Sequence, residues 1–373
     1  MFTIFKPKKY LGIDIGTSSI KLVELKKEGD KLVLNTYGEL KVSENNAGSN
    51  IGKTDMSHMS ERQVSDMLRQ LMVATKTSAK DAVFSIPVFS SFITLMDLPL
   101  MSDKELENSI PFEAKKYIPV PVNEVQFSWS IVEKIAEKNS APQNPLINPT
   151  GPLSASSSAN KIQVLLVAVP NEVMVKYKNI AKSVGLNASF EIETFSIARS
   201  LIRKGVDDKG VVAIIDMGSK STEICVVDDG LLRMSHNFET SGMNITRALS
   251  QGLNLSLEEA EDLKVKNGLK LSSSEKLAMD SIVPLIDMII FEIERINISY
   301  QQRSGRRFQR IILSGGTAKL PGLVDYISNH MGIAVSVANP FSKVYFSPIL
   351  GQMLGDIGPI FSASVGLAER NLA

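Results

Sequence analysis

The sequence of 373 residues lacks the features that would tie it to a membrane, a disulfide framework or a nucleic acid. Its one cysteine, Cys225, excludes an internal disulfide. Its formal net charge of +1 gives no bulk attraction to a polyanion. No apolar run reaches the roughly 18 residues of a membrane-spanning helix, and the start of the chain has no secretory signal. These absences predict a cytoplasmic protein with no membrane span and no nucleic-acid partner.

Two segments, one in each half of the chain, have nearly the same sequence. Aligned without a gap, residues 11–23 match residues 213–225, so that Asp14 corresponds to Asp216 and Gly16 to Gly218. Each segment is a short apolar strand that ends in Asp-x-Gly-[Ser/Thr] and is followed at once by a second strand. Such a turn directs backbone N–H groups and hydroxyls at one point. One copy alone could be an ordinary hairpin, but two copies predict a clamp for a nucleotide.

A third apolar strand, 310–314, runs into Gly315 and Gly316, where glycine permits positive φ and close approach to a flat ligand. In this order the three elements resemble the actin/Hsp70/sugar-kinase superfamily, with two phosphate loops and an adenosine loop. The resemblance implies an α/β, actin-like ATPase fold, in which two ribonuclease-H-like domains surround a nucleotide cleft. It also implies ATP and Mg²⁺ as cofactors.

The hydrophobic pattern after each phosphate loop repeats as well. Strands at 10–15, 20–27 and 31–38 precede an amphipathic helix at 61–75, and strands at 211–216, 222–228 and 231–238 precede a helix at about 243–253. Further helices are expected at 258–268 and at about 275–303. The second of these carries an apolar stripe from Ile282 to Ile296, which we assign to the core rather than to an interface. Two polar segments, 43–59 and 139–160, are expected to be loosely ordered.

The two loops supply candidate phosphate and metal ligands. Phosphate oxygens would contact Gly16, Thr17, Ser18, Ser19 and Lys21 from one side, and Gly218, Ser219, Lys220 and Thr222 from the other. Asp14 and Asp216 are candidate Mg²⁺ ligands, because this ion prefers carboxylate, phosphate and water oxygens. Lys21 has an alternative role as a solvated strand lysine.

Three further groups follow from the superfamily resemblance. Glu193, on a predicted connecting helix, lies where relatives place the residue that polarises the attacking water, although Thr194 replaces their proline. Its alternative is a helix-N-terminal glutamate stabilised by the dipole. Asp216 is the second candidate catalytic residue. The adenosine side would be formed by Gly242, Glu261, Lys264, Gly315, Gly316, Thr317 and Leu320, where Glu261 and Lys264 could instead form only a solvated salt bridge.

Beyond the nucleotide motifs, the chain resembles the PilM family of actin-like type IV pilus assembly proteins. The resemblance rests on residues 9–25, on Asp97-Leu98-Pro99, and on the run IPFEAKKYIPVPVNEV at 110–125. The 139–160 insertion and the missing second glycine before Gly242 are departures. The family implies a cytoplasmic ATP-binding scaffold, peripheral at the inner membrane. Its implied partners are the cytoplasmic N-terminal peptide of a PilN-like bitopic membrane protein, other platform proteins and assembly ATPases, with possible self-association.

The expected organisation is a first domain at 1–80 and 169–205, an FtsA-like inserted subdomain at 81–168, and a second domain at 206–373 with a helical insertion at about 254–305. In the inserted subdomain, a stiff, proline-rich element could form one wall of the peptide groove through Phe112, Tyr117, Ile118 and Val120. Alternatively, these side chains pack the subdomain's own core.

Two rival functions are an FtsA-like filament protein and a small-molecule kinase of the same superfamily, although the sequence has no carboxylate-bearing substrate pocket typical of such kinases.

Overall fold

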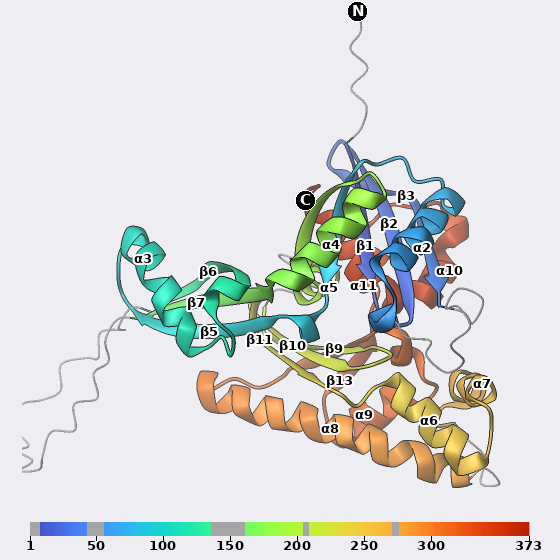
Figure 1. The fold of residues 1–373 in the computed structure, drawn as a ribbon. Helices are drawn as coiled ribbons and strands as arrows, with labels where there is room; N and C mark the ends of the chain where they lie inside the picture. Colours follow the sequence, from blue (N-terminus) through green and yellow to red (C-terminus); the bar gives the residue numbers. More distant parts are fainter. Residues whose placement is uncertain (1–7, 43–55, 136–160, 204–208, 271–275, 373) are drawn as a thin grey trace, which may run out of the picture. The chain divides into compact units, whose positions relative to one another are not determined.

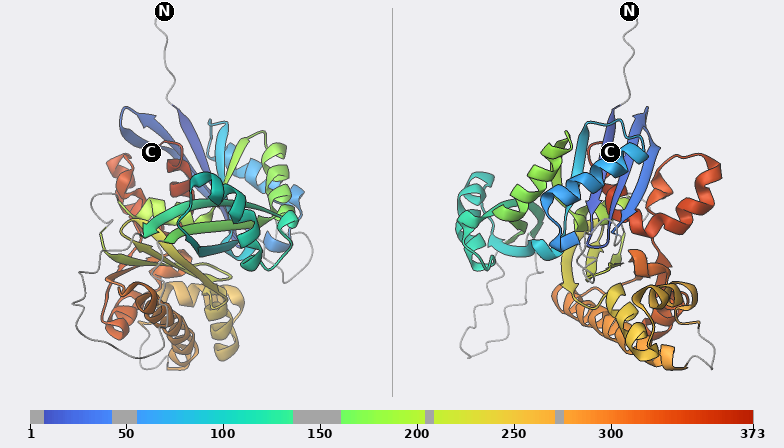
Figure 2. Two further views of the ribbon diagram at one scale, coloured as in Figure 1. Left: turned by 90° about the vertical axis from the view of Figure 1, so that its left-hand side faces the viewer. Right: turned by 45° about the vertical axis from the view of Figure 1, so that its right-hand side comes forward.

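The structure, a computed structural model, describes residues 8–42, 56–135, 161–203, 209–270 and 276–372. The chain divides into two compact units, Met1–Phe89 with Val175–Ala373, and Ser90–Met174 (Figures 1 and 2). Most of the predicted loosely ordered segments lies outside the described residues. At the end of the first, however, Met56–His58 form a 3-10 turn, and Met56 and Met59 are buried. This end of the segment is therefore part of the packed structure.

The first unit contains two five-stranded sheets with the same topology. The first has the order β3-β2-β1-β4-β8, formed by Lys31–Lys41, Ser19–Glu28, Lys9–Ile15, Asp81–Ile86 and Asn187–Ile192. The second has the order β11-β10-β9-β12-β13, formed by Leu231–Phe238, Thr222–Asp228, Val211–Met217, Arg310–Ser314 and Ala334–Val337. In each sheet the first three strands in sequence are antiparallel and the next two are parallel to the central strand. The predicted duplication is confirmed.

The helices of the first unit match most of the predicted ones. They are α2 (Glu61–Ala74), α4 (Asn171–Ser183, which begins in the other unit), α5 (Glu193–Leu201), α6 (Gly242–Leu253), α7 (Leu257–Asn267), α8 (Lys276–Ser304), α9 (Leu323–Met331), α10 (Gly351–Ile357) and α11 (Ser362–Glu369). Helix α2 starts with a capping box between Ser60 and Gln63. The predicted stripe on α8 packs into the core beneath the second sheet, with Ile282, Ile286, Ile289 and Ile293 among its members.

The C-terminal segment departs from the predicted domain boundaries. Residues after β13 were expected to stay with the second domain, but they return to the first sheet. Phe341, Phe361 and Val365 pack against Val23 and Leu25 of β2. The segment holds the 3-10 turns Pro340–Lys343, Pro348–Leu350 and Gly358–Phe361 besides α10 and α11. The packing of this segment on the first sheet depends on contacts between residues that are distant in sequence. Hydrophobic periodicity does not predict such contacts.

Glycines allow α11 to pack unusually close to its neighbours. A Cβ on Gly12 of β1 would overlap the Ser364 carbonyl oxygen of α11. A Cβ on Gly366 would overlap the Ser196 carbonyl oxygen of α5. Helix α11 therefore contacts both the first sheet and the helix that carries Glu193.

The described residues of the second unit form a three-stranded antiparallel sheet, the helix α3 and the start of α4. Strands β5 (Phe92–Pro99), β7 (Lys161–Pro170) and β6 (Val125–Ile135) pair in that order, and α3 (Asp103–Glu113) packs on them. The 3-10 turns Ala114–Lys116 and Val122–Glu124 follow α3. The predicted start of this unit at residue 81 is too early, because β4 pairs with β1 and β8 in the first sheet. The unit begins at Ser90 and ends at Met174.

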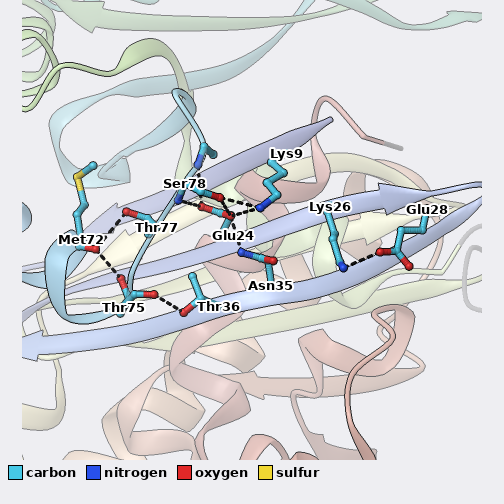
Figure 3. A network of polar contacts seen from close by, with 11 residues as sticks. Lys9, Glu24, Lys26, Glu28, Asn35, Thr36, Met72, Thr75, Thr77 and Ser78 are labelled. Carbon is cyan, nitrogen blue, oxygen red and sulfur yellow. Dashed lines mark hydrogen bonds and ion pairs between the residues drawn. The ribbon is translucent and has the colours of Figure 1, made fainter. Parts of the chain in front are cut away.

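A buried glutamate joins the elements of the first sheet (Figure 3). The Glu24 side chain is fully buried in β2 and accepts hydrogen bonds from the backbone N–H groups of Ser78 (2.6 Å) and Ala79 (2.9 Å). It also accepts from Asn35 Nδ2 at 2.6 Å, and Lys9 Nζ lies 3.6 Å away. These bonds hold the loop before β4 against β2 and β3, and so fix the position of β4 in the sheet.

Among the helices that the structure describes, none has both the length and the apolar character required to cross a bilayer.

Candidate functional site

The two repeated Asp-x-Gly loops have the same turn geometry. In the first, the Gly16 N–H donates to the Ser19 carbonyl at 3.0 Å, and in the second the Gly218 N–H donates to the Ser221 carbonyl at 3.0 Å. These N–H groups close their own turns, so the predicted contacts of Gly16 and Gly218 with phosphate would have to use other atoms of the loops. Because these glycines have no side chain, a ligand can still lie close to their backbone.

The rest of the first loop is anchored from behind. The Thr17 and Ser18 carbonyls accept from the N–H groups of Met56 and Val42, each at 2.9 Å. Ser18 is exposed and Thr17 half-buried, whereas Ser19 is buried. These bonds fix the loop so that the Thr17 and Ser18 side chains are more accessible than that of Ser19. Thr17 and Ser18 are therefore better candidates than Ser19 for contact with phosphate.

Asp14 lies at the end of β1 and is buried, with 7% of its surface exposed. Its Oδ1 accepts from the Ser85 hydroxyl at 2.8 Å, and its Oδ2 is 3.6 Å from Lys21 Nζ. Lys21 sits directly opposite Asp14 in the β1–β2 pairing, and only 14% of its side chain is exposed. Lys21 is therefore a counter-ion of Asp14 rather than a solvated strand lysine.

Asp216 occupies the equivalent position at the end of β9. Loss of solvent raises the pKa of its carboxyl to about 6, opposed first by a hydrogen bond from Ser314 and increased by the nearby Asp14 charge. Ser314 lies opposite Asp216 on the neighbouring parallel strand β12, and Ser85 reaches Asp14 in the same way from β4. Each half of the repeat thus pairs its aspartate with a serine from the adjacent parallel strand.

Glu193 begins α5 and points toward the same carboxylates. Its Oε1 accepts from the Val88 N–H at 2.8 Å. Its pKa is raised well above the ordinary value, first by loss of solvent and then by the Glu223 and Asp14 charges. The structure therefore brings Asp14 and Asp216 close enough for their charges to raise the pKa of Glu193, and the helix-dipole alternative alone does not account for this environment.

Glu223 belongs to this cluster although sequence analysis did not select it. It is buried on β10, opposite Asp216, and accepts hydrogen bonds from Thr194 (2.5 Å) and Ser235 (2.7 Å). Burial raises its pKa to about 7. The repeat contained the signal, because Glu223 aligns with Lys21 when Asp14 is aligned with Asp216. One half of the site therefore carries a lysine where the other carries a glutamate.

The second phosphate loop, α6 and the adenosine loop meet at Gly242. A Cβ at this position would overlap the Thr317 hydroxyl, and would lie 3.3 Å from the Gly218 carbonyl and 3.7 Å from Lys264 Nζ. The Gly242 and Met243 N–H groups donate to the Gly218 and Ser219 carbonyls at 3.0 and 3.1 Å. The expected donor-rich helix start is therefore occupied, and it fixes the loop to α6 instead.

Lys264 is buried under α6 and makes three contacts. Its Nζ donates to Glu261 Oε2 (2.7 Å), Thr246 Oγ1 (2.9 Å) and the Gly242 carbonyl (3.2 Å). Glu261 remains about half-exposed, with 47% of its side chain accessible. The pair is thus more than a solvated salt bridge, because it supports the point where the loops meet.

The remaining predicted nucleotide ligands differ in how accessible they are. The Thr222 hydroxyl donates to the Thr240 carbonyl at 2.6 Å in the interior, so its assignment to phosphate is wrong. Leu320 packs in the core of the second half and supports the adenosine loop from behind. Lys220 is exposed on the second loop.

The adenosine loop combines one constrained glycine with one open glycine. Gly315 has φ +85°, and a Cβ there would lie 2.5 Å from the Met217 carbonyl oxygen. Gly316 is exposed, and a Cβ added to it would meet open space out to 4 Å. Gly315 therefore shapes the turn, and Gly316 presents bare backbone to any ligand that lies beside it.

No group of three or more His, Cys, Asp or Glu residues in the described part of the chain could hold a metal ion alone. This is compatible with Mg²⁺, which is usually held by one or two carboxylates and otherwise by waters and phosphate oxygens. Asp14 and Asp216 supply such carboxylates.

The second unit carries the predicted partner-binding residues. Phe112 and Tyr117 are 69% and 42% exposed, whereas Ile118 is buried in the unit's core and Val120 packs against it. Ile118 is therefore unavailable to a partner. A pocket of about 420 Å³ adjoins this element, lined by Lys115, Val120, Pro121, Val122 and Asn123.

Comparison with known proteins relates the chain to actin-like proteins. It is similar to the cell division protein FtsA of Enterococcus faecalis, with 26% identity over 217 residues, covering 49% of this chain and 49% of that protein. FtsA of Staphylococcus epidermidis is 19% identical over 408 residues, covering 98% of this chain and 79% of that protein. The chain thus spans about half of the first relative's length and most of the second's.

Solved structures support the fold. The PilM–PilN type IV pilus biogenesis complex superposes with a TM-score of 0.79 at 21% identity, covering 99% of this chain and 100% of that chain. MreB5 of Spiroplasma citri bound to AMPPNP has a TM-score of 0.51 at 12% identity, covering 97% and 95%. The fold is actin-like, as predicted. The family described as type IV pilus assembly protein PilM matches residues 12–149 and 152–372, and the chain therefore belongs to this family.

Proposed function

We propose that this protein is an ATP-binding scaffold of a type IV pilus assembly platform. In this proposal the first unit binds ATP with Mg²⁺, and the second binds the cytoplasmic N-terminal peptide of a PilN-like membrane protein. The protein would lie at the inner membrane through that partner, near other platform proteins and assembly ATPases.

The observation that carries the nucleotide proposal is the convergence at Gly242. The Gly218 carbonyl of the second phosphate loop, the Thr317 hydroxyl and Lys264 Nζ all lie within van der Waals contact of a Cβ placed on this first residue of α6. These contacts place the second phosphate loop, the adenosine loop and Lys264 side by side, so that their neighbouring residues could line one site for a phosphorylated nucleoside. The nucleotide carried by the MreB5 relative supports the same assignment.

Mg²⁺ would be held by Asp14 and Asp216, with the remaining ligands from water and phosphate. When bound, the ion would neutralise phosphate charge. Ser85 and Ser314 orient the two carboxylates, and Lys21 reduces the repulsion between them.

Calorimetric titration with ATP, carried out once in the presence of Mg²⁺ and once in the presence of EDTA, tests the site. Asp14→Asn keeps the acceptor for Ser85 but removes the charge, so the fold should survive and Mg·ATP affinity should fall roughly tenfold or more. This variant is preferable to alanine, because Asp14 is buried rather than a surface carboxylate. Exposed Glu258→Gln is the matched control. Unchanged Mg·ATP affinity in Asp14→Asn would contradict the first-loop assignment.

Gly316→Val tests the adenosine loop separately. The valine has open space in the free protein, so the fold should be unaffected while nucleotide affinity falls. Normal affinity would place the adenosine site elsewhere.

Any hydrolysis of bound ATP is proposed to depend on Glu193. A raised pKa suits a carboxylate that accepts a proton from water. Glu193→Gln should therefore reduce phosphate release much more than ATP affinity, and equal loss of both would argue against a role in turnover.

The partner proposal rests on the pocket and on exposed Phe112. A stiff apolar groove lowers the cost of ordering an extended peptide. Phe112→Ala and Val122→Asp should each weaken binding of the PilN-like N-terminal peptide in a fluorescence anisotropy titration. Leu100→Ala, which truncates another exposed apolar side chain of this unit, is the control. Equal affinities across these folded variants would move the docking site away from this element.

A further inference from the structure

Two short connections join the second unit to the first. The chain leaves the first unit after Phe89 and returns to it at Val175. The outgoing connection is the 3-10 turn Val88–Ser90, which follows β4 after one proline. The returning connection is α4, whose first residues belong to the second unit and whose remaining turns belong to the first. Because a helix is a rigid element, a movement of its first turn is carried along it.

The outgoing connection contacts Glu193 directly. The Val88 N–H donates to Glu193 Oε1 at 2.8 Å, and Val88 is the first residue of the turn. Loss of solvent and the charges of Glu223, Asp14 and Asp216 raise the pKa of this carboxyl, whereas the bond from the turn lowers it. The turn therefore orients the Glu193 side chain and favours its ionised form.

The returning connection brings Tyr177 near the same carboxylate. Tyr177 lies on the buried face of α4. After loss of solvent, the Glu193 and Asp14 charges raise the pKa of its phenol, so this ring lies near both carboxylates. At the end of α4, the Ser183 carbonyl accepts a hydrogen bond from Arg69 of α2 at 3.0 Å. The far end of the helix is thus held on the first unit, and Tyr177 lies between this end and the second unit.

The first turn of α4 is bound to the wall of the pocket in the second unit. Asn171 Nδ2, at the start of the helix, donates to the Asn123 carbonyl at 2.9 Å. Pro170, directly before the helix, pairs with Val125 in the β6–β7 ladder. Asn123 lines the pocket of about 420 Å³, and Val125 directly follows the 3-10 turn that contains Asn123. Displacement of this turn by a bound ligand would therefore displace the start of α4.

We propose that α4 couples the pocket of the second unit to Glu193, so that a ligand in the pocket changes the position of the Glu193 side chain relative to the Val88 N–H. The inference rests on the proposed function, in which the pocket binds a peptide of the partner and Glu193 accepts a proton from water. It assigns Asn171, Tyr177 and Val88 as positioning residues for that step.

The sequence supplies a selective probe for this coupling. It contains three Pro-Val pairs, Pro87-Val88, Pro119-Val120 and Pro121-Val122. Protein labelled with ¹³C-carbonyl proline and ¹⁵N-valine therefore gives three selected amide signals in NMR, one at the Glu193 bond and two at the pocket. Val88→Ile deletes one signal and so identifies it. Glu193→Gln should move this signal most, because a neutral acceptor makes a weaker bond to the N–H than a carboxylate does.

Asn171→Ala in the protein alone is the first test. Loss of the bond to Asn123 should shift the Val88 signal by more than its line width, although Val88 is distant in sequence. Glu172→Gln, which changes an exposed residue of the same helix turn, is the matched control and should leave the Val88 signal in place. Combined with Tyr177→Leu, the effect of Asn171→Ala should not be additive. With folding checked by circular dichroism, an unmoved Val88 signal in Asn171→Ala, or additive shifts, would overturn the proposal.

Titration with the PilN-like N-terminal peptide is the second test. Binding in the pocket should shift the Val120 and Val122 signals directly, and the Val88 signal with the same dissociation constant. Shifts at Val120 and Val122 without one at Val88 would overturn the coupling and leave the partner proposal standing. If the peptide moves none of the three signals, the partner proposal fails, and Asn171→Ala alone decides the coupling.

Discussion

Glu223 should make the stability of this protein depend on pH near neutrality, and Glu223→Gln should remove that dependence. The carboxyl is buried between β10, β11 and α5, and accepts bonds from Thr194 and Ser235. Burial raises its pKa from 4.5 to about 7. Glutamine has the same shape and one carbonyl oxygen that can accept both bonds, but it carries no titrating group.

The sign and size follow from proton linkage. Below pH 4.5 the carboxyl is protonated in the folded and the unfolded chain, and its contribution to stability is fully present. Between pH 4.5 and about 7 only the unfolded chain loses the proton, so the free energy of unfolding falls by about 1.4 kcal/mol per pH unit. The loss reaches about 3 kcal/mol near pH 7 and then levels off. The glutamine variant lacks this loss.

Denaturant unfolding at intervals from pH 4.5 to 8.5 measures the effect. The variant should have a stability close to that of the unmodified protein at the acid end, and should be about 3 kcal/mol more stable near pH 8. Groups distant from Glu223 contribute equally in both proteins and cancel, whereas Glu193 loses the Glu223 charge that raises its pKa, which adds to the gain of the variant at high pH. Glu258→Gln, which changes an exposed glutamate, should give a difference independent of pH. A constant difference for Glu223→Gln across this range would refute the buried-carboxyl argument.

Two further predictions concern stability. Gly366→Ala places a Cβ against the Ser196 carbonyl and should lower the free energy of unfolding by about 1–3 kcal/mol, whereas Gly355→Ala, with open space in α10, should be neutral or slightly stabilising by the same denaturation assay. Glu24→Ala leaves the Ser78 and Ala79 N–H groups without their acceptor and should cost about 3 kcal/mol, while Glu28→Ala, an exposed residue paired with Lys26, should cost under about 1 kcal/mol. Equal losses within either pair would contradict these assignments.

Local elements were predictable because they depend on local patterns. The short apolar runs that end in Asp-x-Gly identified both central strands. The Asp229-Gly230 pair, typical of a hairpin turn, lies before β11, and both of its residues have positive φ. The apolar stripe from Ile282 to Ile296 identified the buried face of α8. In each case the residues that determine the structure are neighbours in sequence.

The misplaced features depend on partners that are distant in sequence. Nothing within β4 shows that it pairs with β1 rather than joining the inserted unit, and the return of Val365 to β2 spans most of the chain. The serines behind the two aspartates were missed for the same reason, because Ser85 and Ser314 reach them only across parallel strands. Thr222 was misassigned because a hydroxyl's position in a motif does not reveal which side of the strand it occupies.

The asymmetry within the repeat bears on how a nucleotide could bind. The first half presents Asp14 with Lys21 as its counter-ion at 3.6 Å, whereas the second half presents Asp216 opposite Glu223. Glu193 adds a fourth carboxyl, and its raised pKa reflects the neighbouring charges after burial itself. These four carboxyls have one lysine, Lys21, as a counter-ion. A free triphosphate would add negative charge to this group and is therefore disfavoured. A divalent cation reverses this balance, because it attracts both the carboxylates and the phosphate oxygens. The nucleotide affinity of this site should therefore depend strongly on Mg²⁺.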